Sequence, residues 1–395
     1  MTRLDPARMR HVNRPAKGGA AHATVLSPDD FARAVAEITA WPGYAPTPLY
    51  RLDALAGSLG IGGVLYKNEG PRFGLGSFKA LGGAYAAARL LSRELSKRLG
   101  RDITPADLRS GALASDAAKI TLASATDGNH GRSLAWGARM FGAPCRIYVH
   151  RDVSPGRIAA MEGYGATVTV VDGDYDASVR RTREDADANG WFVVSDTSWE
   201  GYTDPPRDVM AGYGVMAREI ADALATPPSH VLLQGGVGGL AAAIAAAFRQ
   251  HWGANAPRVV IVEPDLAPCL FASARAGAAT PVEIHEETVM AGLSCGEPSA
   301  LAWEILAEEA RDFVTIPDDF VGPTMRLLAR PEGGDAAIAA GESAVAGLAA
   351  LIAAAGDADW QGKLDLGPDS VALVIGSEGV TDRAIYARIM AGAAR

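Results

Sequence analysis

The sequence has few cysteines, no surplus of positive charge and no long apolar run. Its three cysteines in 395 residues form no close Cys-x-x-Cys pair, so neither a disulfide framework nor a thiolate metal site is expected, and a reducing cytoplasm is the expected location. Lys and Arg number 37 against 46 acidic residues, and this net charge of −9 argues against a nucleic-acid partner. The apolar stretches 240–248 and 344–355 are shorter than the roughly 20 residues of a membrane span. The N-terminal arginines precede no apolar run, so no secretory signal is expected.

Short β-branched segments alternate with helical patterns along most of the chain. Residues 63–67 and 230–233 are typical of strands, and 78–99 shows the apolar spacing of a helix. This alternation predicts an α/β fold of βαβ units, with parallel sheets and helices on both faces. The weakly patterned segments 110–119 and 323–332 are expected to be loops.

The first motif is a lysine at the start of a predicted helix. Lys79 follows the glycine-containing segment 74–78, which itself comes after a predicted strand. The helix dipole disfavours a cation at this position and so lowers the pKa of the amine, as a nucleophilic lysine requires. The alternative is an ordinary surface lysine at a helix start.

A second strand-to-helix turn contains Thr126, Asp127, Gly128, Asn129 and His130. Backbone N–H groups at such a helix start suit a carboxylate, and Asn129 can donate to an oxygen on a bound ring. The alternative is a helix cap by Thr126 or Asp127, with His130 as a filler.

Two further motifs come directly after strands. The glycine loop can wrap a phosphate without Cβ clashes, and it consists of Gly235, Gly236, Val237, Gly238 and Gly239. The segment 236–241 also fits a dinucleotide-binding pattern, with Glu263 as the acidic ribose ligand, so this loop alone leaves both cofactors open. Ser377 could offer its hydroxyl to a ring nitrogen, or it could be part of a polar turn.

Together, these four motifs match the four sides of pyridoxal phosphate. In this order they resemble the fold-type II pyridoxal-phosphate enzymes, the group of the threonine and serine dehydratases. The longer segments 72–79, 126–132, 196–202 and 290–298 resemble the diaminopropionate ammonia-lyase family. The segment 377–380 departs from the family, in which Thr is expected at the first position and a polar residue at the last.

The resemblance implies two lobes, each with a twisted, mainly parallel sheet flanked by helices. The large lobe, which binds pyridoxal phosphate, would comprise 1–85 and 205–395, and the small lobe 86–204. It implies Lys79 as the Schiff-base lysine, residues 235–239 as the phosphate loop, and a homodimer without a metal. Asn129 would bond the ring hydroxyl, Phe78 would pack on the ring, and Ser377 would face its nitrogen. The expected substrate-binding residues are Thr126, Asp127, Gly128 and His130.

The implied reaction converts 2,3-diaminopropionate, in its D or L form or both, to pyruvate and two ammonia. Dehydratases usually have a small residue where this chain has Asp127, and a carboxylate there suits a substrate with a second ammonium. Lys79, Asp127 and Asp196 are the expected catalytic residues, with the two aspartates as bases toward opposite stereoisomers.

Other interpretations stay open at this point. They are a serine or threonine dehydratase of the same fold, a nicotinamide-dependent oxidoreductase and a non-catalytic binding protein. Cys269 and Cys295 are expected either near one another at the site entrance, as the resemblance suggests, or as two separate buried thiols.

Lys79→Ala is expected to abolish covalent attachment of the cofactor, because no other lysine lies in a glycine-flanked strand-to-helix turn. The measurement is the visible absorption of the purified protein before and after borohydride reduction. A borohydride-sensitive band that persists in the variant would place the cofactor on another lysine.

Overall fold

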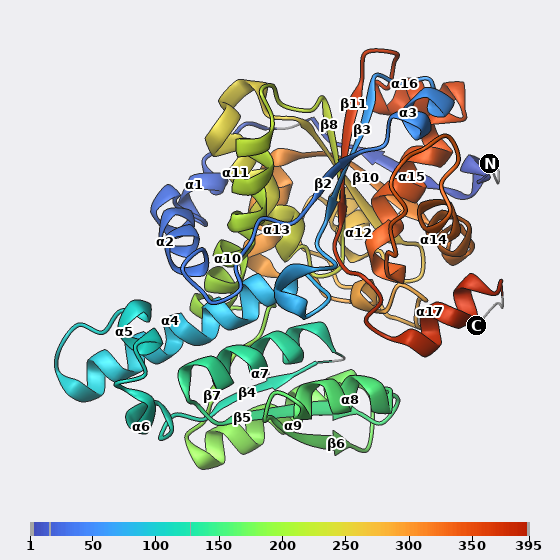
Figure 1. The fold of residues 1–395 in the computed structure, drawn as a ribbon. Coiled ribbons are helices and arrows are strands. Elements are labelled where there is room, and N and C mark those ends of the chain that lie inside the picture. The colour runs from blue at the N-terminus through green and yellow to red at the C-terminus, as the bar shows by residue number, and fades with distance from the viewer. Residues whose placement is uncertain (1–3, 16, 127, 393–395) are drawn as a thin grey trace. The chain divides into compact units, whose positions relative to one another are not determined.

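The computed structural model describes residues 4–15, 17–126 and 128–392. The chain forms two compact units. The large unit comprises Met1–Pro28, Pro46–Ser77 and Met216–Arg395, and the small unit comprises Asp29–Ala45 and Phe78–Val215. Each unit contains its own sheet (Figure 1).

The sheet of the large unit has seven strands in the order β1-β10-β9-β8-β11-β3-β2. The five inner strands run parallel, whereas β1 and β2 are antiparallel edge strands. The strands are β1 (Arg10–Asn13), β2 (Leu49–Arg51), β3 (Gly63–Asn68), β8 (His230–Gln234), β9 (Arg258–Pro264), β10 (Ala310–Ile316) and β11 (Val371–Gly376).

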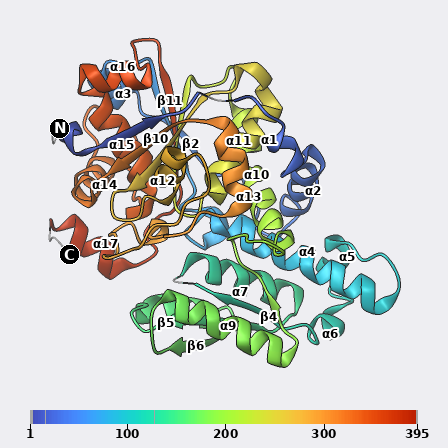
Figure 2. The same cartoon turned by 180° about the vertical axis from the view of Figure 1, so that it is seen from behind.

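Helices cover both faces of this sheet, with α11 and α13 on one side and α14 and α15 on the other (Figures 1 and 2). The inner strands are therefore buried on both faces and contain nearly continuous apolar runs. Every residue of α15 is buried, which explains its apolar composition all around the helix. The helices of this unit are α1 (Ala21–Thr24), α3 (Asp53–Leu59), α11 (Gly239–Trp252), α12 (Cys269–Ala276), α13 (Ala300–Glu309), α14 (Val321–Ala329), α15 (Ala346–Ala355), α16 (Ala358–Leu364) and α17 (Arg383–Met390).

The sheet of the small unit has four parallel strands in the order β6-β5-β4-β7. Helix α7 contacts α8 and β5, and α9 contacts β4 and β5. The strand order and the general right-handedness of such crossovers predict α7 and α8 on one face of this sheet and α9 on the other. The strands are β4 (Leu122–Ala125), β5 (Cys145–His150), β6 (Thr167–Val171) and β7 (Phe192–Val193). The helices are α4 (Lys79–Leu99), α5 (Pro105–Arg109), α6 (Ala114–Ala117), α7 (Asn129–Phe141), α8 (Pro155–Glu162) and α9 (Tyr175–Asn189).

Helix α4 packs closely on α7. A Cβ atom on Gly137 would lie 2.6 Å from the Cα atom of Ala84, so only glycine permits this approach. Helices α2 (Pro28–Ile38) and α10 (Asp204–Ala223) include residues of both units. The short 3₁₀ helices are η1 (Pro6–Arg8), η2 (Arg72–Gly74), η3 (Gly253–Asn255), η4 (Ala291–Leu293), η5 (Asp318–Phe320) and η6 (Glu342–Val345).

The predicted α/β fold is confirmed, and the predicted strands and helices occur within a few residues of their expected bounds. The prediction of a loop at 323–332 is wrong, because Val321–Ala329 forms α14. Pro323 lies in the first turn of this helix, where a missing N–H costs no intrahelical hydrogen bond. The predicted loop 110–119 also contains the short helix α6. None of the helices in the described part of the chain is both long and apolar enough to cross a membrane.

A buried cluster of four charged groups fixes the segment after β3 in the large unit. The Arg72 guanidinium donates to both carboxylate oxygens of Glu69 and to both of Glu219, at 2.7 to 2.8 Å. Lys67 Nζ donates to Glu219 at 2.6 Å and to the Thr47 carbonyl oxygen at 2.8 Å. Two cations thus balance two carboxylates in a site that is closed to water.

Arg72→Met is expected to lower the free energy of unfolding by about 3–5 kcal/mol, because it leaves the buried Glu69 carboxylate without its cation and Glu219 with Lys67 alone. Arg51→Met is the matched control, since Arg51 forms an exposed ion pair with Asp53 and should cost less than about 1 kcal/mol. Urea unfolding of both variants measures the difference. Equal losses would mean that the buried cluster contributes no more than a surface pair.

Candidate functional site

In the small unit, Lys79 is the first residue of α4 and its amine lies against a carboxylate. Lys79 Nζ donates to Asp196 Oδ2 at 2.6 Å, and both side chains are largely buried. Burial raises the pKa of Asp196, but the charge of Lys79 and its hydrogen bond outweigh burial and hold this pKa well below its usual range. The basicity of Asp196 therefore depends on the charge of the lysine beside it.

His130 lies on the other side of the same carboxylate. Its Nε2 is 2.9 Å from the Val194 carbonyl oxygen, and since a carbonyl only accepts, Nε2 carries the proton. In the neutral ring, Nδ1 then presents a lone pair, 3.9 Å from Asp196 Oδ2. Burial is the main cause that lowers the pKa of His130, so the ring is neutral at pH 7.

The turn between β4 and α7 is organised by Thr126. Its Oγ1 accepts from the backbone N–H groups of Gly128, at 3.2 Å, and Gly131, at 3.3 Å. A Cβ on Gly131 would lie 2.4 Å from the Thr126 side chain, so glycine is required there. Asn129 is the first residue of α7. Asp127 lies outside the described residues.

Phe78 precedes Lys79 and is buried against Tyr213. The two ring centroids are 4.7 Å apart, with the planes tilted by 57°. A Cβ on Gly82 would lie 2.5 Å from the Tyr213 ring, so the small residue one turn into α4 makes room for that ring. The aromatic pair therefore fixes the beginning of the helix that carries Lys79.

In the large unit, the glycine loop connects β8 to α11. Gly238 adopts a φ of +96°, in a region that other residues rarely adopt, and no side chain caps the N-terminus of α11. A Cβ on Gly235 would lie 2.6 Å from Glu263 Cγ, and one on Gly236 would lie 3.2 Å from Cys295 Sγ. Glycines without a competing cap leave the backbone N–H groups of the first turn to a ligand, and this arrangement fits a phosphate group.

Glu263 is fully buried at the end of β9 and faces inward. Its two carboxylate oxygens accept from the backbone N–H groups of Leu270, at 2.8 Å, and Phe271, at 2.6 Å, in the first turn of α12. Both oxygens of this carboxylate are hydrogen-bonded to the N-terminus of α12, so Glu263 cannot bind the ribose of a dinucleotide. The structure therefore removes the acidic ligand on which the nicotinamide interpretation depends.

Ser377 directly follows β11 and is buried. Its Oγ lies 3.2 Å from Nε2 of Gln234, the last residue of β8. Gln234 was absent from the residues predicted from sequence. The available signal was a polar residue at the end of an apolar strand, directly before the glycine loop.

Two cysteines flank the glycine loop. Cys269 Sγ lies 3.5 Å from the carbonyl oxygen of Gly236, and Cys295 is the nearest side chain to a Cβ placed on the same glycine. Neither cysteine forms a disulfide within the described parts of the chain, and Cys269 is buried whereas Cys295 is half-buried. The two cysteines thus contact one residue of the predicted phosphate loop.

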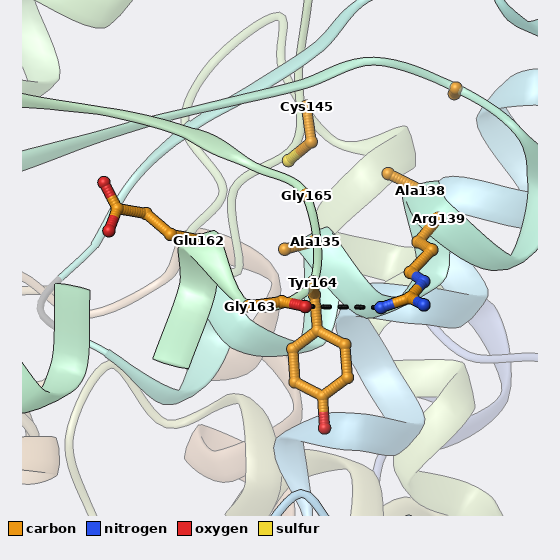
Figure 3. Close-up of a pocket in the computed structure, with 9 residues that line it drawn as sticks. Ala135, Ala138, Arg139, Cys145, Glu162, Gly163, Tyr164 and Gly165 are labelled. Atoms are coloured by element: carbon orange, nitrogen blue, oxygen red, sulfur yellow. Dashed lines mark hydrogen bonds between the residues drawn. The ribbon is translucent and has the colours of Figure 1, made fainter. Parts of the chain in front are cut away.

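A separate pocket of about 370 Å³ lies on the small unit (Figure 3). It is closed at one side by Arg139, whose Nη1 donates to the Gly163 carbonyl oxygen at 3.2 Å. The lining residues are Ala135, Ala138, Arg139, Ala143, Cys145, Glu162, Gly163, Tyr164 and Gly165. This set contains none of the predicted site residues, so the pocket is distinct from them.

Comparisons with known proteins agree with one family. The family model described as pyridoxal-phosphate dependent enzyme matches residues 40–376. The chain is 40% identical to a diaminopropionate ammonia-lyase from Escherichia coli K12, over 88% of each chain. It is 34% identical to a Salmonella typhimurium enzyme of that name, over 88% of this chain and 89% of the other. Structures of the E. coli enzyme with an aminoacrylate–pyridoxal-phosphate intermediate and with D-serine each give a TM-score of 0.87 at 36% identity, covering 97% of this chain and 96% of theirs.

Glu263→Gln is expected to flatten the pH dependence of stability. Burial raises the pKa of Glu263 to about 8, above its usual value of about 4.5. Between these values the folded state keeps a proton that the unfolded state releases, so stability falls as the pH rises from about 4.5 to 8.

Urea unfolding at about pH 5, 6.5 and 8 measures this effect. Glu304→Gln, at an exposed position of α13, is the control and should leave the pH dependence unchanged. If Glu263→Gln retains the full decline, other groups cause it.

Proposed function

This chain belongs to the family of pyridoxal-phosphate-dependent enzymes, and we propose that it converts 2,3-diaminopropionate to pyruvate and two ammonia. The observation that carries the proposal is the contact of Lys79 Nζ with Asp196 Oδ2 at 2.6 Å, at the start of a helix. A nucleophilic amine and a carboxylate at hydrogen-bond distance form the minimal pair for covalent cofactor attachment and proton abstraction.

The proposal assigns the cofactor-holding residues in both units. In the large unit, the glycine loop 235–239 would hold the phosphate through backbone N–H groups other than that of Gly235, which donates to the Val262 carbonyl oxygen at 2.8 Å. The Ser377 hydroxyl would face the ring nitrogen. In the small unit, Lys79 would bind the aldehyde carbon, Asn129 the ring hydroxyl, and Phe78 would pack on the ring. When bound, pyridoxal phosphate supplies an electron sink for the electron pair released at the substrate Cα.

The residues of the small unit would move the protons. The Cα–H bond of the substrate breaks and its proton goes to a carboxylate. We assign this role to Asp196, because its carboxylate lies beside the Lys79 amine. The Cβ–N bond then breaks, and the leaving amine takes up a proton. The released 2-aminoacrylate takes up water and gives pyruvate and the second ammonia. The substrate carboxylate would bind in the turn of Thr126, Gly128 and His130, with Asp127 as the carboxylate for the substrate's second ammonium.

We propose further that Asp127 and Asp196 act on opposite stereoisomers. The α-hydrogen of the D form and that of the L form leave from opposite faces of a planar adduct. One carboxylate cannot reach both faces at hydrogen-bond distance. His130 supports this role of Asp196, because a neutral ring beside the carboxylate adds no competing positive charge.

Asp127→Asn and Asp196→Asn are each expected to lower kcat for one isomer by about 10²–10⁴-fold and to affect the other far less, as the loss of a general base implies. The measurement is the rate of pyruvate release from D- and L-diaminopropionate. Asp187→Asn, at an exposed position of α9, serves as the control for a lost carboxylate. If both variants lose D and L activity in equal proportion, the two carboxylates do not divide the isomers between them, and their role is confined to binding the β-ammonium.

Serine and threonine in the same assay separate the proposed function from that of a dehydratase of the same fold. An ammonia-lyase should release pyruvate faster from diaminopropionate than from serine. Faster turnover of serine, or of threonine to the corresponding four-carbon keto acid, would favour the dehydratase.

We also propose a cytoplasmic homodimer in which the large lobe of 1–85 and 205–395 carries the phosphate loop and the small lobe is 86–204. This proposed division differs from the two compact units, which assign residues 29–45, 78–85 and 205–215 to the small unit. The three cysteines, none of which forms a disulfide among the described residues, support a reducing compartment. Sedimentation equilibrium of the purified protein tests the assembly, since a mass near twice the 40.9 kDa of the chain is expected.

A further inference from the structure

Gln234 is a buried polar residue at the end of an otherwise apolar run in β8. It is 2% exposed and directly precedes the glycine loop. A buried amide without hydrogen bonds is strongly unfavourable, so the hydrogen-bond partners of Gln234 indicate why it is there.

The orientation of this amide is fixed by two carbonyl groups. Gln234 Nε2 lies 2.5 Å from the carbonyl oxygen of Ile375 in β11 and 3.2 Å from that of Ala344 in η6. Carbonyl oxygens only accept, so the opposite orientation would place Oε1 against two acceptors. Oε1 itself has no hydrogen-bond partner among the described residues.

This orientation determines what the Ser377 hydroxyl can do. Its Oγ lies 3.2 Å from Gln234 Nε2, and because an amide nitrogen does not accept, Ser377 accepts here. The two protons of the Gln234 amide are offered to three acceptors, the carbonyl oxygens of Ile375 and Ala344 and the Ser377 hydroxyl oxygen. One of these protons is therefore shared between two acceptors. Within the described parts of the chain, the hydroxyl proton of Ser377 has no acceptor of its own. Ser377 is therefore a hydrogen-bond donor without a protein partner.

We propose that Gln234 is a positioning residue, which keeps the Ser377 hydroxyl as a donor to the ring nitrogen of the cofactor. This inference rests on the proposed function, because it needs a bound pyridine ring. A hydroxyl that donates to the ring nitrogen leaves that nitrogen unprotonated, so Gln234 would set the protonation state of the ring without touching it. The competing role is a purely structural one, in which Gln234 only links β8, β11 and η6.

The test uses the holoenzyme loaded with pyridoxal phosphate labelled with ¹⁵N in the ring. The ring-nitrogen chemical shift and the cofactor dissociation constant are measured for Gln234→Met, Ser377→Ala and the double variant. Gln250→Met is the matched control, because Gln250 Nε2 also donates to two carbonyl oxygens, those of His22 and Leu26, elsewhere in the large unit.

The expected result is a ring-nitrogen shift in the same direction for Gln234→Met and Ser377→Ala, with no further change in the double variant. Cofactor binding should weaken about two- to tenfold in each single variant, as the loss of one neutral hydrogen bond implies. Gln250→Met should leave both quantities at their wild-type values.

A wild-type ring-nitrogen shift in folded Gln234→Met would overturn the proposal and leave Gln234 a structural residue. Gln234→Glu is the second variant, in which the carboxylate accepts the Ser377 proton. It should resemble Ser377→Ala in the ring-nitrogen shift, and a wild-type shift would likewise contradict the proposal. Failure of the proposed function is distinguishable, because the wild-type protein would then bind no pyridoxal phosphate.

Discussion

The proposed chemistry of this chain depends on the contact between Lys79 and Asp196. This contact joins the first residue of α4 to the segment after β7, because Lys79 Nζ lies 2.6 Å from Asp196 Oδ2. Burial disfavours the charge on Asp196, and Lys79 restores it. The folded protein loses stability if either partner of such a buried ion pair is removed. The pair also makes the proton affinity of the carboxylate depend on the charge of the amine.

Carboxylates at two strand ends have opposite tasks in this protein. Glu263 accepts hydrogen bonds from two backbone N–H groups and so stabilises the N-terminus of α12. Burial raises its pKa. Asp196 lies beside a cation and a neutral histidine, so it stays ionised, as its proposed role as a base requires. The neighbours of each carboxylate, more than its place after a strand, decide which one can take part in catalysis.

Sequence patterns located most of the motifs at the strand ends. Alternating strands and helices predicted the α/β fold, and the glycine loop and Lys79 occur at the expected strand-to-helix turns. The patterns did not reveal α14, because Pro323 suggested a loop although its position in the first turn is compatible with a helix. Gln234 was missed for a different reason, since its partner Ser377 is 143 residues away in the sequence.

The buried cluster of Arg72 could not be predicted for the same reason. Its partner Glu219 is 147 residues away, and local periodicity contains no information about such pairs. Glu263 shows the reverse case, in which a motif matched the sequence but the side chain faces inward toward α12. Motif spacing therefore identified candidate positions. Which groups each side chain contacts could be seen only in the folded structure.

The most direct test of the proposed function is the product ratio that the purified protein gives with 2,3-diaminopropionate. Pyruvate and ammonia are expected in a ratio of one to two, with no nicotinamide cofactor added. Ammonia released without pyruvate, or no turnover of diaminopropionate by protein that has bound pyridoxal phosphate, would contradict this function.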